Sequence, residues 1–217
     1  MVKAVVFDVG ETLIDETRIW TRWAERIGVS YFVLMGALGG MAALDRSHSE
    51  AFEIIRPGID LDAEEAAWER DDPDGLRNHF DGDDLYPDVR PALGALREAG
   101  YQVIIAGNQP RRAYDALAAM ELPADSVHTS DGWGVAKPQP EFFAKVAAVA
   151  GREPEEILYV GDRLDNDVLP AGRAGMRTAL LRRGPWGYLH AARPEARAAD
   201  VIVDDLHEVL EAARRLT

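Results

Sequence analysis

The sequence contains no cysteine. A chain without cysteine has no disulfide framework, no thiolate metal site and no cysteine nucleophile. This absence fits a reducing compartment, and we expect a cytoplasmic protein. Lysine is also scarce, because Lys3, Lys137 and Lys145 are the only three. Any chemistry that needs a lysine therefore has few candidates.

Positive charge is in the minority, with 24 Lys and Arg against 38 Asp and Glu and a net charge of -14. An acidic surface repels phosphate backbones and anionic lipids, so we expect neither nucleic-acid nor membrane partners. A small phosphorylated substrate remains possible, since one local positive site can be built inside an acidic protein. The longest apolar stretch, residues 31–44, is too short to cross a bilayer and is predicted to form a buried helix. The first residues lack the features of a secretory signal.

Short apolar runs alternate with helical patterns over most of the chain. Strands are predicted at residues 4–7, 101–106, 126–128, 157–160, 177–181 and 201–203, and helices at 87–99, 111–120, 141–150, around 171–174 and at 206–216. Strands separated by single helices form βαβ units, which predicts an α/β fold with a doubly wound parallel sheet. Residues 16–85 show helical spacing and no convincing strand. We therefore predict an α/β core of residues 1–15 and 86–217 and a helical insertion of residues 16–85.

Polar residues follow the strands of this predicted sheet. Asp8 follows the first strand, Gly107 and Asn108 follow the second, and Asp162 follows the fourth, while Lys137 lies just before a helix. The carboxyl ends of parallel strands meet at one edge of a sheet, so these positions can converge. Asp8 and Asp162 are hard oxygen ligands that suit Mg²⁺. Lys137 would keep the carboxylates from repelling one another and would attract an anion.

This combination of groups predicts phosphoryl chemistry. Backbone N–H groups after Asp8 and near Gly107 can cradle phosphoryl oxygens. A carboxylate beside Mg²⁺ and a lysine can attack phosphorus and form an aspartyl-phosphate, which water then hydrolyses.

The four stretches resemble, in order and in spacing, the four motifs of the haloacid dehalogenase (HAD) superfamily. The matching residues are 7–13, 105–108, Lys137-Pro138 with Phe142-Phe143, and 161–167 continuing to 171–176. The resemblance covers nearly the whole chain outside residues 16–85. It implies a Rossmann-like core, and it implies that residues 16–85 form a small all-helical cap that closes over the site and selects the substrate.

The same resemblance implies a Mg²⁺-dependent phosphatase, a phosphoric monoester hydrolase acting on small phosphorylated metabolites. Asp8 would be the nucleophile, and Lys137 would neutralise charge. The metal would be held by Asp8, the backbone carbonyl of Gly10 and Asp162, while Asp167 would hold Lys137 or a metal-bound water. The phosphate would contact the loop residues Gly10, Glu11 and Thr12 together with Gly107, Asn108 and Lys137, and Thr12 would also steady the loop. The oligomeric state is left open.

Two positions depart from the family pattern. Gly10 stands where family phosphatases usually carry an aspartate that serves as general acid and base, a loss that typically costs roughly 10²–10⁴-fold in rate. Glu11 is adjacent, but we expect its side chain to point elsewhere. Gly107 stands where a serine or threonine usually binds a phosphoryl oxygen. Two alternatives therefore stay open: a catalytically weakened binding or regulatory protein, and a haloacid dehalogenase.

Overall fold

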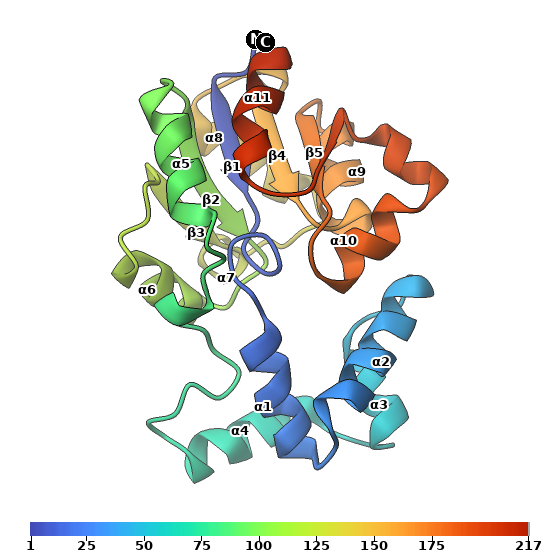
Figure 1. The fold of residues 1–217 in the computed structure, drawn as a ribbon. Coiled ribbons are helices and arrows are strands. Elements are labelled where there is room, and N and C mark those ends of the chain that lie inside the picture. Colours follow the sequence, from blue (N-terminus) through green and yellow to red (C-terminus); the bar gives the residue numbers. More distant parts are fainter. Residues whose placement is uncertain (217) are drawn as a thin grey trace. The chain divides into compact units, whose positions relative to one another are not determined.

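The protein is described here from a computed structural model that covers residues 1–216, so Thr217, the last residue of the predicted core, lies outside the described residues. Two compact units are present (Figure 1). One comprises Met1–Asp15 and the chain from Leu85 onward, and the other comprises Glu16–Asp84. Whether these units also fold as separate domains stays a prediction.

The first unit contains a six-stranded sheet in the order β3-β2-β1-β4-β5-β6, and every recorded strand pair is parallel. The strands are β1 (Ala4–Phe7), β2 (Gln102–Gly107), β3 (Ser126–Thr129), β4 (Ile157–Gly161), β5 (Arg177–Leu181) and β6 (Val201–Val203). Strand order reverses between β1 and β4, which makes the carboxyl end of β1 the switch point where open α/β sheets bind ligands. The predicted doubly wound parallel sheet is confirmed.

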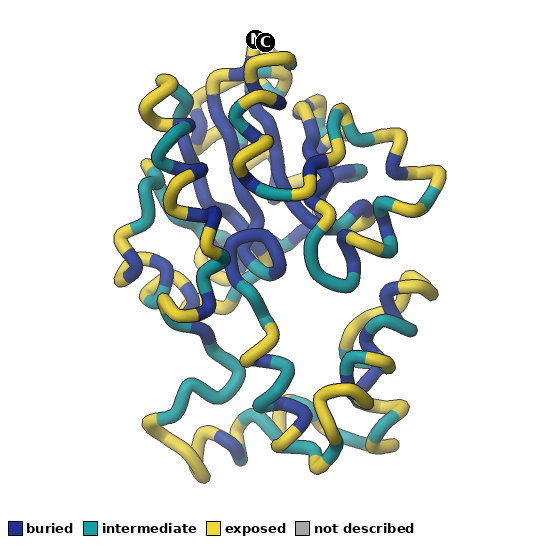
Figure 2. The backbone as a smooth tube through the Cα atoms, viewed as in Figure 1, coloured by how far each residue is buried: buried dark blue, intermediate teal, exposed yellow. Residues whose placement is uncertain are grey.

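The central strands are apolar because both faces of the sheet are covered. All four residues of β1 are buried, and Figure 2 shows the strands as the buried interior of this unit. The helices are α5 (Val89–Glu98), α6 (Arg111–Ala119), α7 (Ser130–Trp133), α8 (Pro140–Ala150), α9 (Leu169–Arg173), α10 (Gly184–Ala191) and α11 (His207–Arg215). In Figure 1, α5 and α11 lie in front of the sheet and α8 and α9 lie behind it. On the α8 side, Phe142 and Phe143 pack against Val6 and Tyr159.

Two aspartates bind the amino-terminal ends of strands on opposite sides of the sheet. Asp125, which precedes β3, accepts a hydrogen bond at 2.8 Å from the backbone N–H of Val103 in β2. Asp200, which precedes β6, accepts one at 2.8 Å from the backbone N–H of Thr178 in β5. Each side chain thus joins an outer strand to its inner neighbour at the edge remote from Asp8.

The chain leaves and re-enters this unit through paired segments. Ile14 and Leu85 form an antiparallel bridge, and the backbone N–H of Tyr86 donates to the carbonyl of Leu13 at 3.0 Å. The departing and returning backbones are therefore neighbours.

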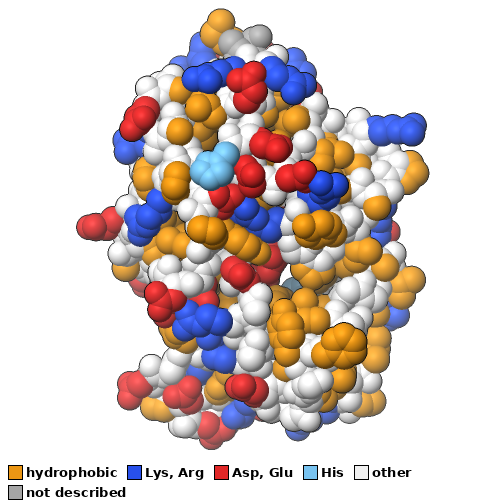
Figure 3. Space-filling view, viewed as in Figure 1, with side chains coloured by type: hydrophobic (Ala, Val, Ile, Leu, Met, Phe, Trp, Pro, Cys, Tyr) orange, Lys and Arg blue, Asp and Glu red, His pale blue; other side chains and the backbone are white. Residues whose placement is uncertain are grey.

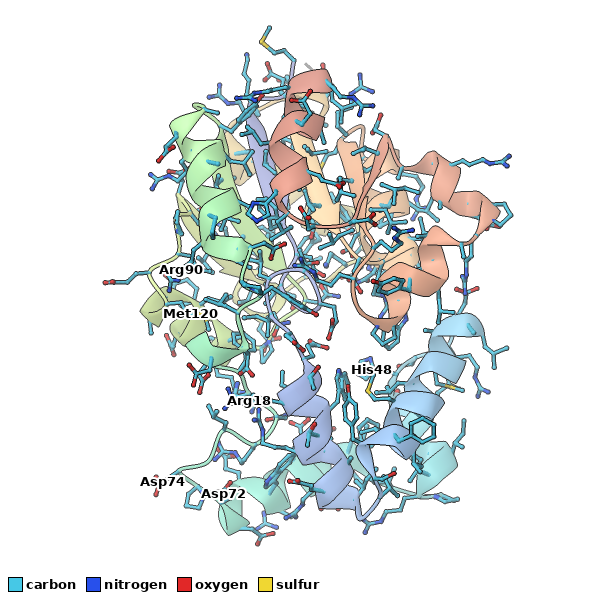
Figure 4. The ribbon with its side chains drawn as sticks, in the orientation of Figure 1. Arg18, His48, Asp72, Asp74, Arg90 and Met120 are labelled. Carbon is cyan, nitrogen blue, oxygen red and sulfur yellow. The ribbon has the colours of Figure 1, made fainter. Side chains whose placement is uncertain are left out.

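The second unit contains four α-helices: α1 (Thr17–Ile27), α2 (Tyr31–Ala43), α3 (Ser49–Ile55) and α4 (Leu61–Asp71). No strand occurs among its residues, all of which are described. Its aromatic residues pack with one another. The ring of Trp23 lies 5.0 Å from that of Phe52 and 5.1 Å from that of Trp68. Trp20 lies 6.1 Å from His48, which Figure 4 labels.

The prediction of a buried helix at residues 31–44 is only half right. The helix exists as α2, and Leu34, Leu38 and Met41 are buried. Phe32, however, is 85% exposed, and Val33 and Leu44 are also exposed. Figure 3 shows apolar side chains gathered on the surface of this unit. The error arises because an apolar composition without charged residues does not reveal which face of a short helix is covered.

Membrane crossing is the remaining question about α2. Among residues 1–216, no single helix is both long and apolar enough to cross a membrane. Only α1 and α2 taken together, across a bend of 110°, pass that test of length and composition.

Candidate active site

Asp8 occupies the switch point of the sheet. Phe7 is paired with Ile105 of β2 and with Val160 of β4, so Asp8 is the first residue beyond the end of β1. The backbone N–H of Asp8 donates to the carbonyl of Val160 at 2.9 Å, which fixes its main chain against β4. Gly107 and Asp162 are placed beside it by β2 and β4.

Lys137 joins two carboxylates in the interior. Its Nζ lies 2.7 Å from Oδ1 of Asp8 and 2.5 Å from Oδ1 of Asp167. Lys137 is only 4% exposed. Burial alone would lower the pKa of Lys137, but the adjacent carboxylates of Asp167 and Asp8 raise it well above its usual value. Lys137 is therefore a fixed positive charge in contact with Asp8.

The backbone of Lys137 is held by Asn108. The side-chain N–H of Asn108 donates to the carbonyl of Lys137 at 2.8 Å, and the N–H of Lys137 donates to Oδ1 of Asn108 at 2.7 Å. Tyr159 lies on the other side, with its ring centroid 5.6 Å from Nζ and its hydroxyl donating to the carbonyl of Ala106. The Asn108 amide is thus used to place the lysine. A role for Asn108 in binding phosphate stays a prediction.

Three buried aspartates form a group that could hold a metal ion. Ligand oxygens of Asp8, Asp162 and Asp167 all lie within 4.8 Å of one another. Burial, followed by the charges of Asp167 and Asp8, raises the pKa of Asp162 well above its usual value. Burial likewise raises the pKa of Asp167 to about 6, against the opposing effect of Lys137. Three carboxylates share one lysine in this group, so a divalent cation would balance the excess negative charge. The residues present therefore fit a divalent metal ion.

The loop after Asp8 closes on itself. The N–H of Glu11 donates to the carbonyl of Ile14 at 2.8 Å, and the N–H of Thr12 donates to that of Val9 at 3.3 Å. Both N–H groups, which the sequence suggested for phosphate binding, are hence engaged within the loop. The hydroxyl of Thr12 is buried without a hydrogen-bond partner, so backbone hydrogen bonds, rather than this hydroxyl, hold the turn.

The side chain of Glu11 is buried and engaged. Its backbone adopts a left-handed conformation with φ of 48°, and its Oε2 accepts a hydrogen bond at 2.6 Å from the hydroxyl of Tyr86. Gly184 has φ of 61° and packs so closely that a β-carbon on it would lie 2.7 Å from Glu11 Oε2. Arg183, which precedes Gly184, places its guanidinium carbon 4.0 Å from the centroid of the Tyr86 ring. It also donates a hydrogen bond to the carbonyl of Thr12 at 2.9 Å.

Sequence reasoning missed Tyr86, Arg183 and Gly184 as residues that hold the Asp8 loop. None of them belongs to the four motifs. Only Tyr86 could have been suspected from the sequence, because it lies two residues after the insertion ends, where the chain re-enters the sheet unit. The side-chain partners come from segments far apart in the chain, and no local pattern relates them.

Comparison with known proteins gives a consistent set of relatives. The family model for haloacid dehalogenase-like hydrolases matches residues 2–175. A glyceraldehyde 3-phosphate phosphatase from Methanopyrus kandleri is 28% identical over 232 aligned residues, covering 100% of this chain and 99% of the relative. Phosphoglycolate phosphatase 1 from Pseudomonas aeruginosa is 33% identical over 133 aligned residues, which are 60% of this chain and 47% of that protein.

A solved structure resembles the whole fold. The L-2-haloacid dehalogenase from Xanthobacter autotrophicus matches with a TM-score of 0.69 and 22% identity, covering 100% of both chains. At this level of identity the match concerns the fold alone, and it agrees with the six-stranded sheet and the helical insertion described above.

Proposed function

The chain belongs to the haloacid dehalogenase-like hydrolases, and on that premise we propose that it is a Mg²⁺-dependent phosphatase of small phosphorylated metabolites. The observation that carries the proposal is the buried contact of Asp8 with Lys137, beside Asp162 and Asp167, at the carboxyl end of β1. This set supplies a carboxylate nucleophile, a fixed cation and oxygen ligands for a metal.

In the proposed reaction, the carboxylate of Asp8 attacks phosphorus and displaces the alcohol of the substrate. An oxygen–phosphorus bond forms at Asp8, the bond from phosphorus to the alcohol oxygen breaks, and the leaving oxygen takes a proton from solvent water. Lys137 contacts Oδ1 of Asp8, which leaves Oδ2 as the attacking oxygen. Water then hydrolyses the aspartyl-phosphate and restores Asp8.

Asp8, the carbonyl of Gly10 and Asp162 would hold Mg²⁺. When bound, Mg²⁺ would stabilise negative charge on the transferring phosphoryl group. Asp167 supports the site through its ion pair with Lys137 rather than through the substrate. The lysine keeps its charge because two carboxylates raise its pKa, so it stays a cation at neutral pH.

Glyceraldehyde 3-phosphate and phosphoglycolate are the first substrates to test. They are the substrates named for relatives in two different organisms, and one of those relatives matches this chain over its whole length. Both are small, anionic phosphate esters, as the proposed chemistry requires.

The test compares wild type with Asp8→Asn in hydrolysing an aryl phosphate, with and without Mg²⁺. An aryl phosphate has a good leaving group, so it partly compensates for the missing acid at Gly10. We expect Mg²⁺-dependent turnover that Asp8→Asn abolishes. The control is Asp115→Asn, which replaces an exposed aspartate on α6 and should keep the wild-type rate. Full turnover by Asp8→Asn would refute the mechanism.

A second function deserves a test because Gly10 offers no acid and Glu11 is engaged by Tyr86. The protein would then bind Mg²⁺ and phosphate but scarcely turn over. Calorimetric titration with Mg²⁺ and inorganic phosphate would show binding while a broad panel of phosphate esters is left intact. A 2-haloacid tested on the same samples decides the dehalogenase alternative.

A further inference from the structure

The space beside Gly107 is filled by the carboxylate of Asp8. Gly107 is the last residue of β2, and a β-carbon placed on it would lie 2.5 Å from Oδ1 of Asp8. It would also lie 3.0 Å from Cγ2 of Val9 and 3.2 Å from the backbone nitrogen of Val9. Non-bonded atoms do not pack at 2.5 Å, so any side chain at position 107 requires the carboxylate to move.

The oxygen that faces Gly107 is also the oxygen that Lys137 holds. Nζ of Lys137 lies 2.7 Å from Oδ1 of Asp8. Lys137 cannot easily follow a displaced carboxylate, because Asp167 binds its Nζ and Asn108 binds its backbone on both sides. The main chain of Asp8 is bonded to β4 through Val160. A side chain at position 107 would therefore rotate the Asp8 carboxylate away from Lys137.

We propose that Gly107 is a positioning residue whose lack of a side chain lets the Asp8 carboxylate lie against Lys137. A serine at this position would displace the nucleophile instead of adding a ligand for the phosphoryl group. The glycine is then a requirement of this site and not a loss from it. The inference rests on the proposed function only in taking Asp8 as the attacking group.

A substitution at position 107 tests whether there is room for a side chain beside Asp8, because the backbone there does not require glycine. Gly107 is not among the glycines with positive φ, so alanine and serine can adopt its backbone angles. Gly94, inside α5, is the matched control, since a β-carbon there would have no neighbour within 4 Å. Gly94→Ala should leave turnover unchanged and keep or raise the thermal midpoint.

The first experiment is a double-mutant cycle that does not depend on activity. The thermal midpoint is measured for Gly107→Ala in the wild-type chain and in an Asp8→Ala chain. In the wild-type chain we expect a fall of roughly 2–6 °C, because overpacking is destabilising. In the Asp8→Ala chain the fall should largely disappear, because the obstructing carboxylate is gone. An equal fall in both backgrounds would overturn the proposal.

The second experiment measures turnover of an aryl phosphate with Mg²⁺ by Gly107→Ala and Gly107→Ser. Both variants should lose about 10²-fold in kcat with little change in KM, since a misplaced nucleophile affects the reaction more than binding. A serine variant faster than wild type, or tenfold faster than the alanine variant, would assign the hydroxyl to phosphate binding and contradict the proposal. If wild type hydrolyses no phosphate ester, the proposed function fails, while the thermal cycle still decides the role of Gly107.

Discussion

At Asp162, burial and the neighbouring charges of Asp167 and Asp8 raise the pKa of the carboxyl group. Replacing this carboxylate by the neutral amide of Asn removes part of that repulsion. We expect Asp162→Asn to raise the thermal midpoint of metal-free protein. We also expect it to abolish the stabilisation by Mg²⁺, which reaches about 2.7 kcal/mol at a hundredfold excess over Kd. Thermal unfolding in EDTA and in Mg²⁺ measures both effects.

Asp165→Asn is the control for this prediction. Asp165 lies three residues away, is half exposed and pairs with Arg163 outside the aspartate group. Its variant should keep the wild-type response to Mg²⁺. A normal Mg²⁺ response in Asp162→Asn would show that Asp162 is not a metal ligand.

Tyr86 reaches the Asp8 loop through one hydroxyl. Burial and the nearby Glu11 carboxylate raise the pKa of Tyr86, so its hydroxyl stays protonated and donates to Glu11. Tyr86→Phe keeps the ring beneath Arg183 and removes only that donor. Losing a hydrogen bond to a buried carboxylate costs about 1–3 kcal/mol, and we expect urea unfolding to show a loss in that range. Turnover should fall as well, because Glu11 belongs to the loop that carries Asp8.

Tyr188→Phe provides the comparison, because Tyr188 is 65% exposed on α10. Its free energy of unfolding should change by no more than about 0.5 kcal/mol. Equal stabilities of the Tyr86→Phe and wild-type proteins would mean that the Glu11 contact contributes nothing.

The sequence was sufficient to place Asp8, Lys137 and Asp162 at one edge of the sheet, because each follows a strand or precedes a helix and parallel strands fix which edge they share. The contact of Asp167 with Lys137 was implied only by the family resemblance. The rest depends on side-chain rotamers. The same glycine at position 107 reads as a missing ligand in the sequence and as room for a carboxylate in the structure. Nothing in a motif distinguishes those two meanings.

Asp125 and Asp200 each fix the start of an inner strand. Each lies just before an outer strand and accepts a hydrogen bond from a backbone N–H near the beginning of the neighbouring inner strand. Replacing either by Ala leaves a backbone N–H of the sheet without its acceptor. We expect each variant to lose about 1–2 kcal/mol in urea unfolding. Turnover should be unchanged, because both residues lie at the edge remote from Asp8.

Asp74→Ala is the matched control for these strand variants. Asp74 is an exposed aspartate of the helical insertion, labelled in Figure 4, and its loss should leave stability within about 0.5 kcal/mol of wild type. If Asp125→Ala and Asp200→Ala unfold like Asp74→Ala, the two hydrogen bonds do not stabilise the sheet.

Among the elements, strands were easier to predict than the short helical turns. The strands at 177–181 and 201–203 match β5 and β6 residue for residue. The sequence predicted no element over the π-helical turn Leu164–Val168, which carries Asp167. It has no apolar period of its own and exists because Asp167 is drawn inward to Lys137 and to the N–H of Arg163. Arg90, which donates to the carbonyl of Met120 at 2.6 Å, shows the same dependence on distant partners (Figure 4).

The whole molecule carries a net charge of -14. Its field opposes the approach of a phosphate ester dianion, and salt weakens that field because the screening length falls from about 30 Å at 0.01 M to about 8 Å at 0.15 M. We therefore expect kcat/KM for a phosphate monoester to rise as KCl is increased at constant Mg²⁺. Initial rates at substrate concentrations well below KM provide the measurement.

Sucrose in place of KCl controls for non-ionic effects and should leave kcat/KM unchanged apart from viscosity. A fall of kcat/KM with KCl would mean that the local positive charge of the metal and Lys137 governs approach, and that the net charge of the chain does not.

The bridge between Ile14 and Leu85 has a consequence for how the helical insertion can be changed. The chain leaves the sheet unit at Ile14 and re-enters it at Leu85, and these two residues are already neighbours. The helices between them can therefore be lengthened, shortened or exchanged without changing the pairing of any strand in the sheet. The cost of closing a loop grows only slowly with its length. The sheet unit can therefore accept different insertions at this one position. Exchanging the insert would leave Asp8 and Lys137 untouched, because both belong to the sheet unit.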